Sequence, residues 1–458
     1  MFERAGAPRR VLKSVPKIAA HRKRLSGEGK QLTYDWRQKV ARTDRPRELT
    51  GYHAACDLPL RDLSEPPHTA GTTSRPGVPA SALTGLRVMS ACDRLCPVFF
   101  ARVLKTGTLA IGIAMLRSRV GHAQPQQVSH DYSIHNFAFA DGESLPELRL
   151  HYVTLGSPSR DANGVVRNAV LILHGTTGSG AAFLRPAFAG ELFGPGKALD
   201  TSRFYVILPD GIGHGRSSKP SDGMHAHFPR YAYDDMVNAQ HRLVSEGLGV
   251  NHLRLVIGTS MGCMHAWIWG ERFPEFVDGL VPLACVPAQI AGRNRMMRKI
   301  VIDAIRTDPA WNGGEYSSPP VQAMRTAAAM AFVMGSSSIQ LQRAAPTRDA
   351  ADSLITKTID EGIRGIDAND LLYALEASRD YDPSLELGSI RAAVLAINSA
   401  DDVVNPPELG LMETLMPRVK RGRYVLIPIS DQTRGHGTHS LPAIWKEYLG
   451  EFLRELPQ

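Results

Sequence analysis

The chain has 458 residues, of which 43% are hydrophobic, and this length is enough for one large α/β domain with residues to spare. A formal net charge of +8 would suit nucleic-acid or membrane binding, but residues 1–123 carry more than this surplus, so residues 124–458 are mildly acidic. We therefore expect no nucleic acid among its partners. No apolar run approaches the roughly 18 to 20 residues that span a bilayer as a helix, so we expect no stable membrane insertion.

The first segment, residues 1–88, combines basic clusters with Pro, Gly, Ser and Thr and has no sustained hydrophobic period. Such a composition buries too little apolar surface to offset the entropy of ordering the chain, so we expect a disordered basic leader. If translation begins near Met89, this leader is upstream sequence rather than part of the protein.

A second segment, residues 89–123, has the order of a secretory signal peptide. Basic residues precede the apolar run 106–116, and small residues lead to a cleavage site after Ala123. Arg117 and Arg119 beyond the apolar run are atypical, and a short amphipathic helix or membrane-proximal anchor is the alternative. Cleavage would make the protein periplasmic or secreted, whereas an uncleaved chain would be cytoplasmic.

Residues 124–458 alternate short apolar runs with helical patterns. An alternating stretch at 147–155 predicts an edge hairpin strand. Apolar runs that end in Gly or Asp loops predict parallel strands at 169–173, 204–208, 253–257, 280–285, 392–397 and 424–429. Helical patterns separate them at 233–246, 261–272, 407–416 and 443–453. This alternation predicts a mostly parallel central sheet with helices on both faces.

Between about residues 287 and 383 the pattern is mainly helical. A long insertion at this point would lie over the carboxyl ends of the strands, where open α/β sheets bind ligands. We therefore predict a helical lid.

The pentapeptide Gly258-Thr259-Ser260-Met261-Gly262 joins a predicted strand to a predicted helix, as a nucleophile elbow does. Two glycines are needed because the turn brings the two backbones too close for a Cβ. Ser260 is thus the predicted nucleophile, and the Met261 N–H can face a developing oxyanion.

A serine hydroxyl needs a general base, and the base needs a carboxylate to orient it. In this fold class the order along the chain is Ser, then Asp or Glu, then His. Asp402 and His436 follow the last two predicted strands, and therefore lie at the same sheet edge as Ser260. The alternatives are Asp401, which we expect to be a solvated loop carboxylate, and His439, which would begin the last helix.

Two local features favour the first choice at each position. Pro406 stands four residues after Asp402, as expected after the acid in this fold, and Gly435 before His436 would let the loop approach the serine.

The second oxyanion donor should come from the Gly-rich loop 174–180, where Thr176 is our choice and Thr177 the fallback. This loop lacks the ending of a phosphate-binding P-loop, so it predicts no nucleotide cofactor. The loop 211–218 is read as structural. His225 and His227 have metal-ligand spacing but no evident third ligand, so we expect no metal and no cofactor.

Two cysteines, Cys263 and Cys285, lie in the predicted folded part, and the other three lie within residues 1–123. We expect two buried free thiols, although an exported protein could pair them because they lie on a helix and an adjacent strand.

Several stretches resemble the homoserine O-acetyltransferase family of α/β-hydrolase-fold enzymes over about residues 130–455. They are D-M-V-N-A-Q at 235–240, G-T-S-M-G-C-M-H-A at 258–266, A-I-R-T-D-P at 304–309, G-G-E-Y at 313–316 and D-A-N at 367–369. The resemblance implies an α/β-hydrolase fold with a helical lid insertion and Ser260 as the nucleophile that accepts the acyl group. It also implies Asp402 and His436 as partners of the serine, and a possible homodimer with the lids at its interface.

One departure bears on the substrate. Ile302 stands where the family has an arginine, and a carboxylate-bearing amino acid needs a cation. Four arginines nearby could substitute: Arg293, Arg295, Arg298 and Arg306. We therefore predict a serine hydrolase of a small ester or related acyl compound. The alternatives are a homoserine O-acetyltransferase-like enzyme that moves an acetyl group from acetyl-CoA to an alcohol, and a non-catalytic binding protein.

Overall fold

The computed structural model describes residues 127–457, so the predicted leader (1–88) and signal peptide (89–123) lie outside the described residues. An eight-stranded sheet has the order β1-β2-β4-β3-β5-β6-β7-β8. The β1–β2 and β2–β4 pairs are antiparallel and all other pairs are parallel. The strands are β1 (Gln127–Ala138), β2 (Ser144–Leu155), β3 (Ala169–Leu173), β4 (Tyr205–Pro209), β5 (Leu253–Thr259), β6 (Val277–Leu283), β7 (Ala393–Ser399) and β8 (Gly422–Ile427).

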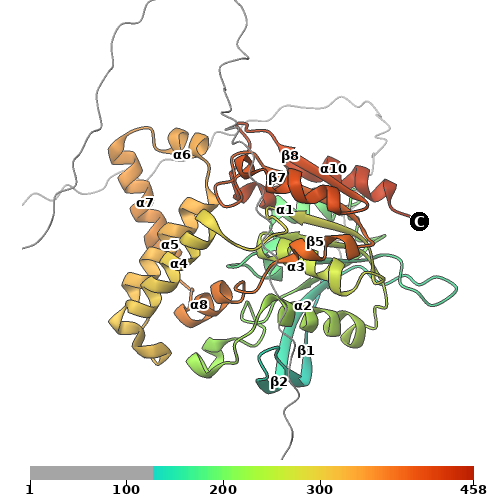
Figure 1. The fold of residues 1–458 in the computed structure, drawn as a ribbon, viewed down its shortest axis with the longest axis horizontal. Coiled ribbons are helices and arrows are strands. Elements are labelled where there is room, and N and C mark those ends of the chain that lie inside the picture. Colours follow the sequence, from blue (N-terminus) through green and yellow to red (C-terminus); the bar gives the residue numbers. More distant parts are fainter. Residues whose placement is uncertain (1–126, 458) are drawn as a thin grey trace, which may run out of the picture. The chain divides into compact units, whose positions relative to one another are not determined.

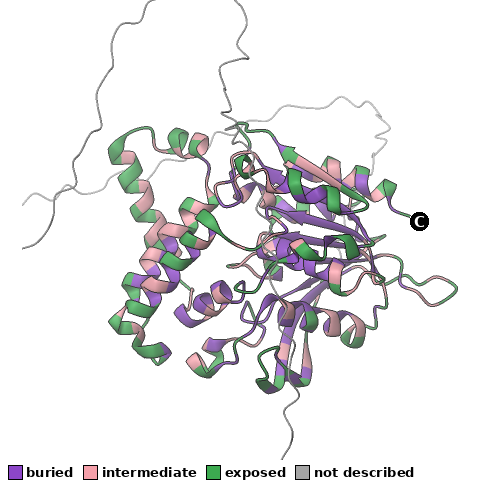
Figure 2. Ribbon diagram, in the orientation of Figure 1, coloured by how far each residue is buried: buried purple, intermediate pink, exposed green. Residues whose placement is uncertain are grey.

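Helices cover both faces of this sheet (Figure 1). In β3, Leu171 and Leu173 face a core shared with α2 (Tyr233–Arg242) and α3 (Met261–Arg272). Ile172 faces the opposite core, which α1 (Pro186–Leu192) and α10 (Pro442–Glu455) cover. Because side chains alternate along a strand, a strand buried on both faces must be apolar throughout. Figure 2 accordingly shows the central strands buried along their length.

The segment between β6 and β7 is helical, and its helices gather beside the sheet in Figure 1. They are α4 (Gly292–Thr307), α5 (Val321–Gly335), α6 (Ser338–Ala344), α7 (Arg348–Gly362) and α8 (Ala368–Glu376). These helices have a hydrophobic core of their own, to which Ile302, Met324 and Leu372 belong. We call residues 287–383 the helical insertion. The short helix α9 (Leu411–Leu415) follows β7.

The edge of the sheet differs from the prediction. The strand predicted at 147–155 is not an edge strand, because β1 pairs with β2 along its whole length and takes the edge position. Most of β1 is exposed or half-buried and polar, and only Ile134 and Phe137 are fully buried. A strand with so few buried residues has no hydrophobic pattern strong enough to be seen in the sequence.

The expectation of two free thiols is wrong, because Cys263 and Cys285 form a disulfide. Cys263 lies in the first turn of α3, and Cys285 follows the end of β6, the strand beside β5. The tight turn between β5 and α3 starts the helix next to the end of β6, and the two Cα atoms are 5.9 Å apart. This separation is within the range that a disulfide bridges.

We predict that this disulfide stabilises the domain. Replacing both cysteines with serine should lower the free energy of unfolding by about 3 kcal/mol, because the bond closes a loop of sequence separation 22 in the unfolded chain. Chemical denaturation of the wild type and the double variant measures the difference. Alkylation of Cys263 and Cys285 in denatured, unreduced wild-type protein, read by peptide mass spectrometry, would contradict the pairing.

Candidate active site

The turn that presents Ser260 is tight and strained. Ser260 has φ 54° and ψ −108°, a backbone conformation that residues other than glycine rarely adopt. A Cβ at Gly258 would lie 1.9 Å from the carbonyl oxygen of Gly262, and one at Gly262 would lie 2.1 Å from that of Leu173. The close approach predicted between strand and helix is confirmed at Gly258, and Gly262 requires glycine because α3 passes the end of β3.

Three side chains from separate loops meet at this turn. The Ser260 hydroxyl lies 2.8 Å from His436 Nε2, and His436 Nδ1 lies 2.9 Å from Asp402 Oδ2. If His436 is neutral with its proton on Nδ1, it donates to the carboxylate and accepts from the serine. Ser260 follows β5, Asp402 follows β7 and His436 follows β8. The three predicted residues are therefore within hydrogen-bond distance in series.

The surroundings of Asp402 favour its ionised form. Its side chain is fully buried, and Oδ1 accepts hydrogen bonds from the amides of Val404 (2.7 Å) and Asn405 (3.1 Å). Oδ2 also accepts one from the Asn405 side-chain amide at 3.1 Å. Burial raises the pKa of Asp402, but the charge and hydrogen bond of His436 and the bonds from Asn405 and Val404 outweigh it, so the pKa is below its ordinary value.

The two alternative residues lie close by but make other contacts. Asp401, which we expected to be a solvated loop carboxylate, is half-buried, and its Oδ1 accepts from the Ser399 hydroxyl at 2.5 Å and its Oδ2 from the Thr433 hydroxyl at 2.8 Å. His439 precedes the last helix and stacks edge-on against His436 with 5.3 Å between ring centres. Burial, with a contribution from His436, lowers the pKa of His439 to about 3. Neither residue takes part in the Ser260 hydrogen-bond series.

The loop that carries His436 is packed against the helical insertion. Gly435 has φ +59°, and a Cβ there would lie 2.4 Å from the carbonyl oxygen of Ser336, between α5 and α6. Arg343 of α6 pairs with Asp431 at 2.6 Å. Gly435 therefore makes room for the insertion, whereas we had expected it to bring the loop close to the serine.

The Gly-rich loop after β3 passes beside the serine. A Cβ at Gly175 would lie 3.3 Å from that of Ser260. The carbonyl of Thr176 accepts a hydrogen bond from His214 Nε2 at 2.8 Å, and the amides of Thr176 and Thr177 donate no hydrogen bond to any described residue. Met261 is the first residue of α3, so its amide has no partner within the helix.

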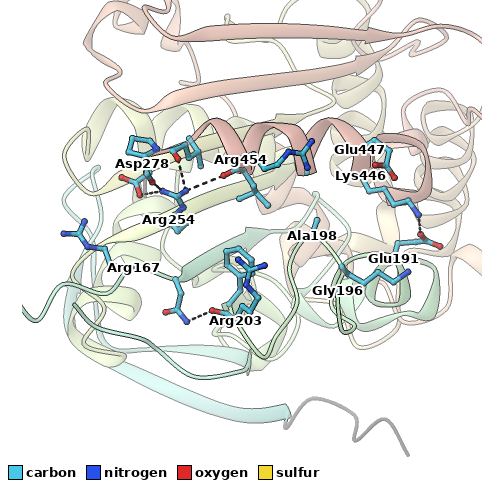
Figure 3. Close-up of a pocket in the computed structure, with 17 residues that line it drawn as sticks. Arg167, Glu191, Gly196, Ala198, Arg203, Arg254, Asp278, Lys446, Glu447 and Arg454 are labelled. Carbon is cyan, nitrogen blue, oxygen red and sulfur yellow. Dashed lines mark hydrogen bonds and ion pairs between the residues drawn. The ribbon is translucent and has the colours of Figure 1, made fainter. Parts of the chain in front are cut away.

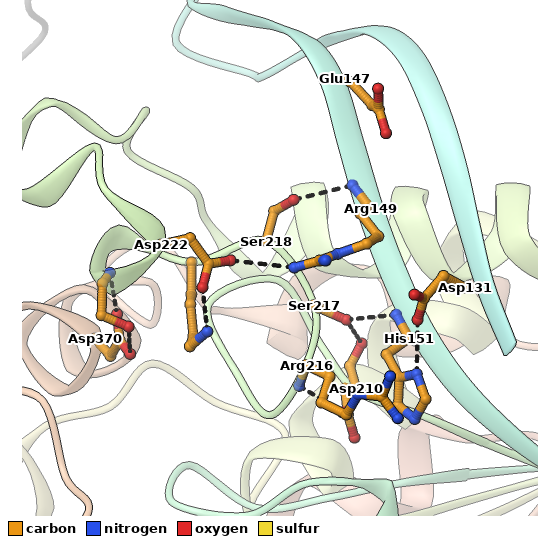
Figure 4. Close-up of polar contacts among 12 residues, drawn as sticks. Asp131, Glu147, Arg149, His151, Asp210, Arg216, Ser217, Ser218, Asp222 and Asp370 are labelled. Carbon is orange, nitrogen blue, oxygen red and sulfur yellow. Dashed lines mark hydrogen bonds and ion pairs between the residues drawn. The ribbon is translucent and has the colours of Figure 1, made fainter. Parts of the chain in front are cut away.

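A polar network around Asp210 and Ser217, shown in Figure 4, also holds the end of the Gly-rich loop. Asp210 accepts hydrogen bonds from the amides of Gly180 (2.7 Å) and Arg216 (2.8 Å). The Ser217 hydroxyl donates to the Asp210 carbonyl at 2.8 Å and accepts from the His151 amide at 2.9 Å. These bonds join the loop 211–218 to both β2 and the Gly-rich loop. They fix the positions of the two loops relative to the sheet.

Ser260 and His436 line a cavity of about 550 Å³. Its wall combines the Gly-rich loop, the helix α1, the His436 loop and three helices of the insertion, α4, α5 and α8. Most side chains in this wall are apolar, among them Met264, Met330 and Leu371. A cavity of this size suits a small organic ligand.

A larger cavity of about 1080 Å³ lies away from these residues, where β3 to β6 begin (Figure 3). Its lining is mostly charged, and three of its cations are paired: Lys446 with Glu191 at 2.7 Å, Arg254 with Asp278 at 3.1 Å and Arg167 with Asp161 at 2.6 Å. Neither Ser260, His436 nor Asp402 lines it. Among the described residues, no group of three His, Cys, Asp or Glu side chains suits a metal, and no helix is long and apolar enough to cross a membrane.

Sequence reasoning missed two residues that hold this arrangement. Asn405 donates to Asp402 Oδ2 and also to the Ala284 carbonyl at 3.0 Å. Its position three residues after the acid in a turn was the available signal. His214, which holds the Thr176 carbonyl, had no such signal, because the contact depends on the packing of two loops.

Comparisons with known proteins agree with this fold. Residues 168–415 match the family described as alpha/beta hydrolase fold. A "Probable acyltransferase" of Methanothermobacter thermautotrophicus is 32% identical over 63% of this chain and 88% of its own length. A "Homoserine O-acetyltransferase" of Leifsonia xyli subsp. xyli is 31% identical over 70% of this chain and 87% of its own length.

Among solved structures, a homoserine O-acetyltransferase from Bacillus anthracis aligns with a TM-score of 0.64 and 21% identity, over 72% of this chain and 99% of its own. The esterase E22 aligns with a TM-score of 0.62 and 21% identity, over 72% of this chain and all of its own. These structures support the fold, and the family match and the sequence relatives support enzymatic acyl transfer. The chain therefore belongs to the alpha/beta hydrolase fold family and is an enzyme related to homoserine O-acetyltransferases.

Proposed function

We propose that this enzyme is a serine hydrolase that cleaves a small ester or related acyl compound through an acyl-serine intermediate. The observation that carries the proposal is the hydrogen-bonded series of Ser260, His436 and Asp402 at the wall of the 550 Å³ cavity. A hydroxyl, an imidazole and a buried carboxylate in that order activate a serine for attack on a carbonyl carbon.

In the first half-reaction, Ser260 Oγ bonds to the carbonyl carbon while its proton passes to His436 Nε2. The ionised Asp402 stabilises the imidazolium that forms, and its lowered pKa supports this role. The amides of Met261 and Thr176, with Thr177 as the alternative to Thr176, hold the oxyanion. His436 then gives the proton to the leaving alkoxide as the carbon–oxygen bond breaks.

In the second half-reaction, His436 removes a proton from a water molecule whose oxygen attacks the acyl-serine carbonyl. The ester bond to Ser260 breaks, the serine recovers its proton from His436, and the carboxylic acid leaves. We propose that the helical insertion, about residues 287–383, acts as a lid, because three of its helices contribute to the cavity wall.

The second candidate is an acyltransferase in which an alcohol replaces the attacking water. The curated sequence relatives named as acyltransferases favour it. Position 302, where the family has an arginine, is 1% exposed, belongs to the core of the insertion and does not line the cavity, so Ile302 does not contact an acceptor bound beside Ser260. The homodimer, the signal peptide and the location of the protein stay predictions.

Turnover separates the two candidates. The wild-type chain should hydrolyse p-nitrophenyl acetate and should not acetylate homoserine from acetyl-CoA, which spectrophotometry and mass spectrometry of the products measure. Ser260→Ala should lower ester hydrolysis by about 10⁴-fold or more, since the nucleophile is removed while the fold is kept. Homoserine acetylation that exceeds hydrolysis would favour the transferase.

The base assignment makes a separate prediction. His436→Ala should lower kcat for p-nitrophenyl acetate by about 10⁴-fold, because no other described side chain lies within hydrogen-bond distance of Ser260 Oγ. His439→Ala, the matched control, should stay within about tenfold of wild type, because His439 forms no hydrogen bond with Ser260 and its low pKa makes it a weak base. If His439→Ala lowers kcat by much more than His436→Ala does, His439 and not His436 is the general base.

A further inference from the structure

A buried arginine lines the same cavity as the serine. Arg298 lies on α4 in the helical insertion, is 3% exposed and contributes to the wall of the 550 Å³ cavity. A guanidinium stays charged at any working pH, so the interior of this cavity carries a permanent positive charge.

The protein gives this charge only neutral partners. Arg298 Nε donates to the Asn294 side-chain oxygen at 3.0 Å, and Nη1 lies 3.4 Å from the Ser378 hydroxyl. Within residues 127–457, Arg298 forms no ion pair, and its Nη2 donates no hydrogen bond. Two of its five N–H donors therefore have a protein acceptor, and neither acceptor is charged.

The rest of the wall adds no negative charge. No Asp or Glu is among the described residues that line this cavity, and the second charged side chain is Arg185, which is exposed at its rim. Removing a charge from water without a counter-ion costs free energy, and an anion that enters the cavity removes that cost. The cavity is therefore electrostatically suited to an anionic ligand.

The other arginines of α4 do not share this environment. Arg293 is exposed, Arg295 is half-buried, and Arg306 pairs with Glu376 at 2.7 Å. None of these three lines the cavity. Of the four arginines that could replace the cation missing at position 302, only Arg298 is available to a ligand beside Ser260.

We propose that the substrate is a small ester that carries one carboxylate, and that Arg298 binds this carboxylate while Ser260 attacks the ester carbonyl. This inference rests on the proposed function. The planar guanidinium can donate from Nη1 and Nη2 to the two carboxylate oxygens, and the apolar side chains of Met264, Met330 and Leu371 enclose the carbon chain. Arg298 is in this way a specificity-determining residue, and neutral esters of the same length bind without its contribution.

Matched ester pairs test the proposal. One pair places the carboxylate on the acyl side, p-nitrophenyl hydrogen adipate against p-nitrophenyl hexanoate. The other places it on the alcohol side, 3-acetoxypropanoate against propyl acetate. In at least one pair the wild type should show about 10-fold or higher kcat/KM for the anionic ester, the size expected for a charge-assisted hydrogen bond. Equal kcat/KM values within both pairs would overturn the proposal without any variant.

Variants then assign the preference to one residue. Arg298→Met should lower kcat/KM for the preferred anionic ester by about 10- to 100-fold, mainly through KM, and change the neutral ester by less than about threefold. Arg298→Lys keeps the charge without the planar fork and should recover part of the loss. Arg293→Met, on the exposed part of the same helix, should match the wild type. An equal loss for both esters in folded Arg298→Met and Arg298→Lys proteins would overturn the assignment.

A binding measurement separates this inference from the proposed function. Calorimetric titration of Ser260→Ala protein with monomethyl adipate and with methyl hexanoate needs no turnover. If the Ser260→Ala protein binds monomethyl adipate and the Ser260→Ala/Arg298→Met protein does not, the carboxylate site is supported. If the wild type also hydrolyses no ester, that second result rejects only the proposed function. Hydrolysis by the wild type without any Arg298-dependent preference or binding would reject only the carboxylate site.

Discussion

The close contact of backbones around Ser260 is the constraint on which the rest of the structure depends. Gly258 lets strand β5 approach the start of helix α3, and Gly262 lets α3 approach the end of strand β3, each to a distance at which any Cβ would overlap a carbonyl oxygen. This approach forces Ser260 into a positive φ and lifts its hydroxyl out of the sheet. The same turn starts α3 beside the end of β6, which places Cys263 within disulfide distance of Cys285. One steric requirement therefore determines the positions of both the Ser260 hydroxyl and the Cys263–Cys285 disulfide.

The remaining groups reach this turn through the parallel sheet. Since the carboxyl ends of parallel strands meet at one edge, loops after β7 and β8 bring Asp402 and His436 to the same place although they lie far from Ser260 in the sequence. The helical insertion closes the arrangement from the other side. It packs on the His436 loop at Gly435 and supplies Arg298 to the cavity wall, so the geometry of the base and the charge of the cavity depend on the same segment.

Patterns with a strong local cause were predictable from the sequence. The strand at 169–173 and the helix at 261–272 have the bounds that their apolar runs and flanking glycines indicated. Features that depend on contacts between distant segments were not predictable. The mostly exposed strand β1 has too few buried residues to form a pattern, and the disulfide depends on how α3 leaves the sheet. Arg298 was one of four equivalent arginines in the sequence, and only the packing of α4 against its neighbours distinguishes it.

The central claim is that one strained turn presents one activated hydroxyl, and covalent labelling tests it most directly. A fluorophosphonate should react once per chain, losing fluoride and adding the mass of its phosphonyl group to the peptide that contains Ser260, because only an activated serine attacks phosphorus at a useful rate. The His436→Ala protein should remain unlabelled under the same conditions. Labelling at another residue, or an active enzyme that the reagent neither labels at Ser260 nor inhibits, would contradict the account.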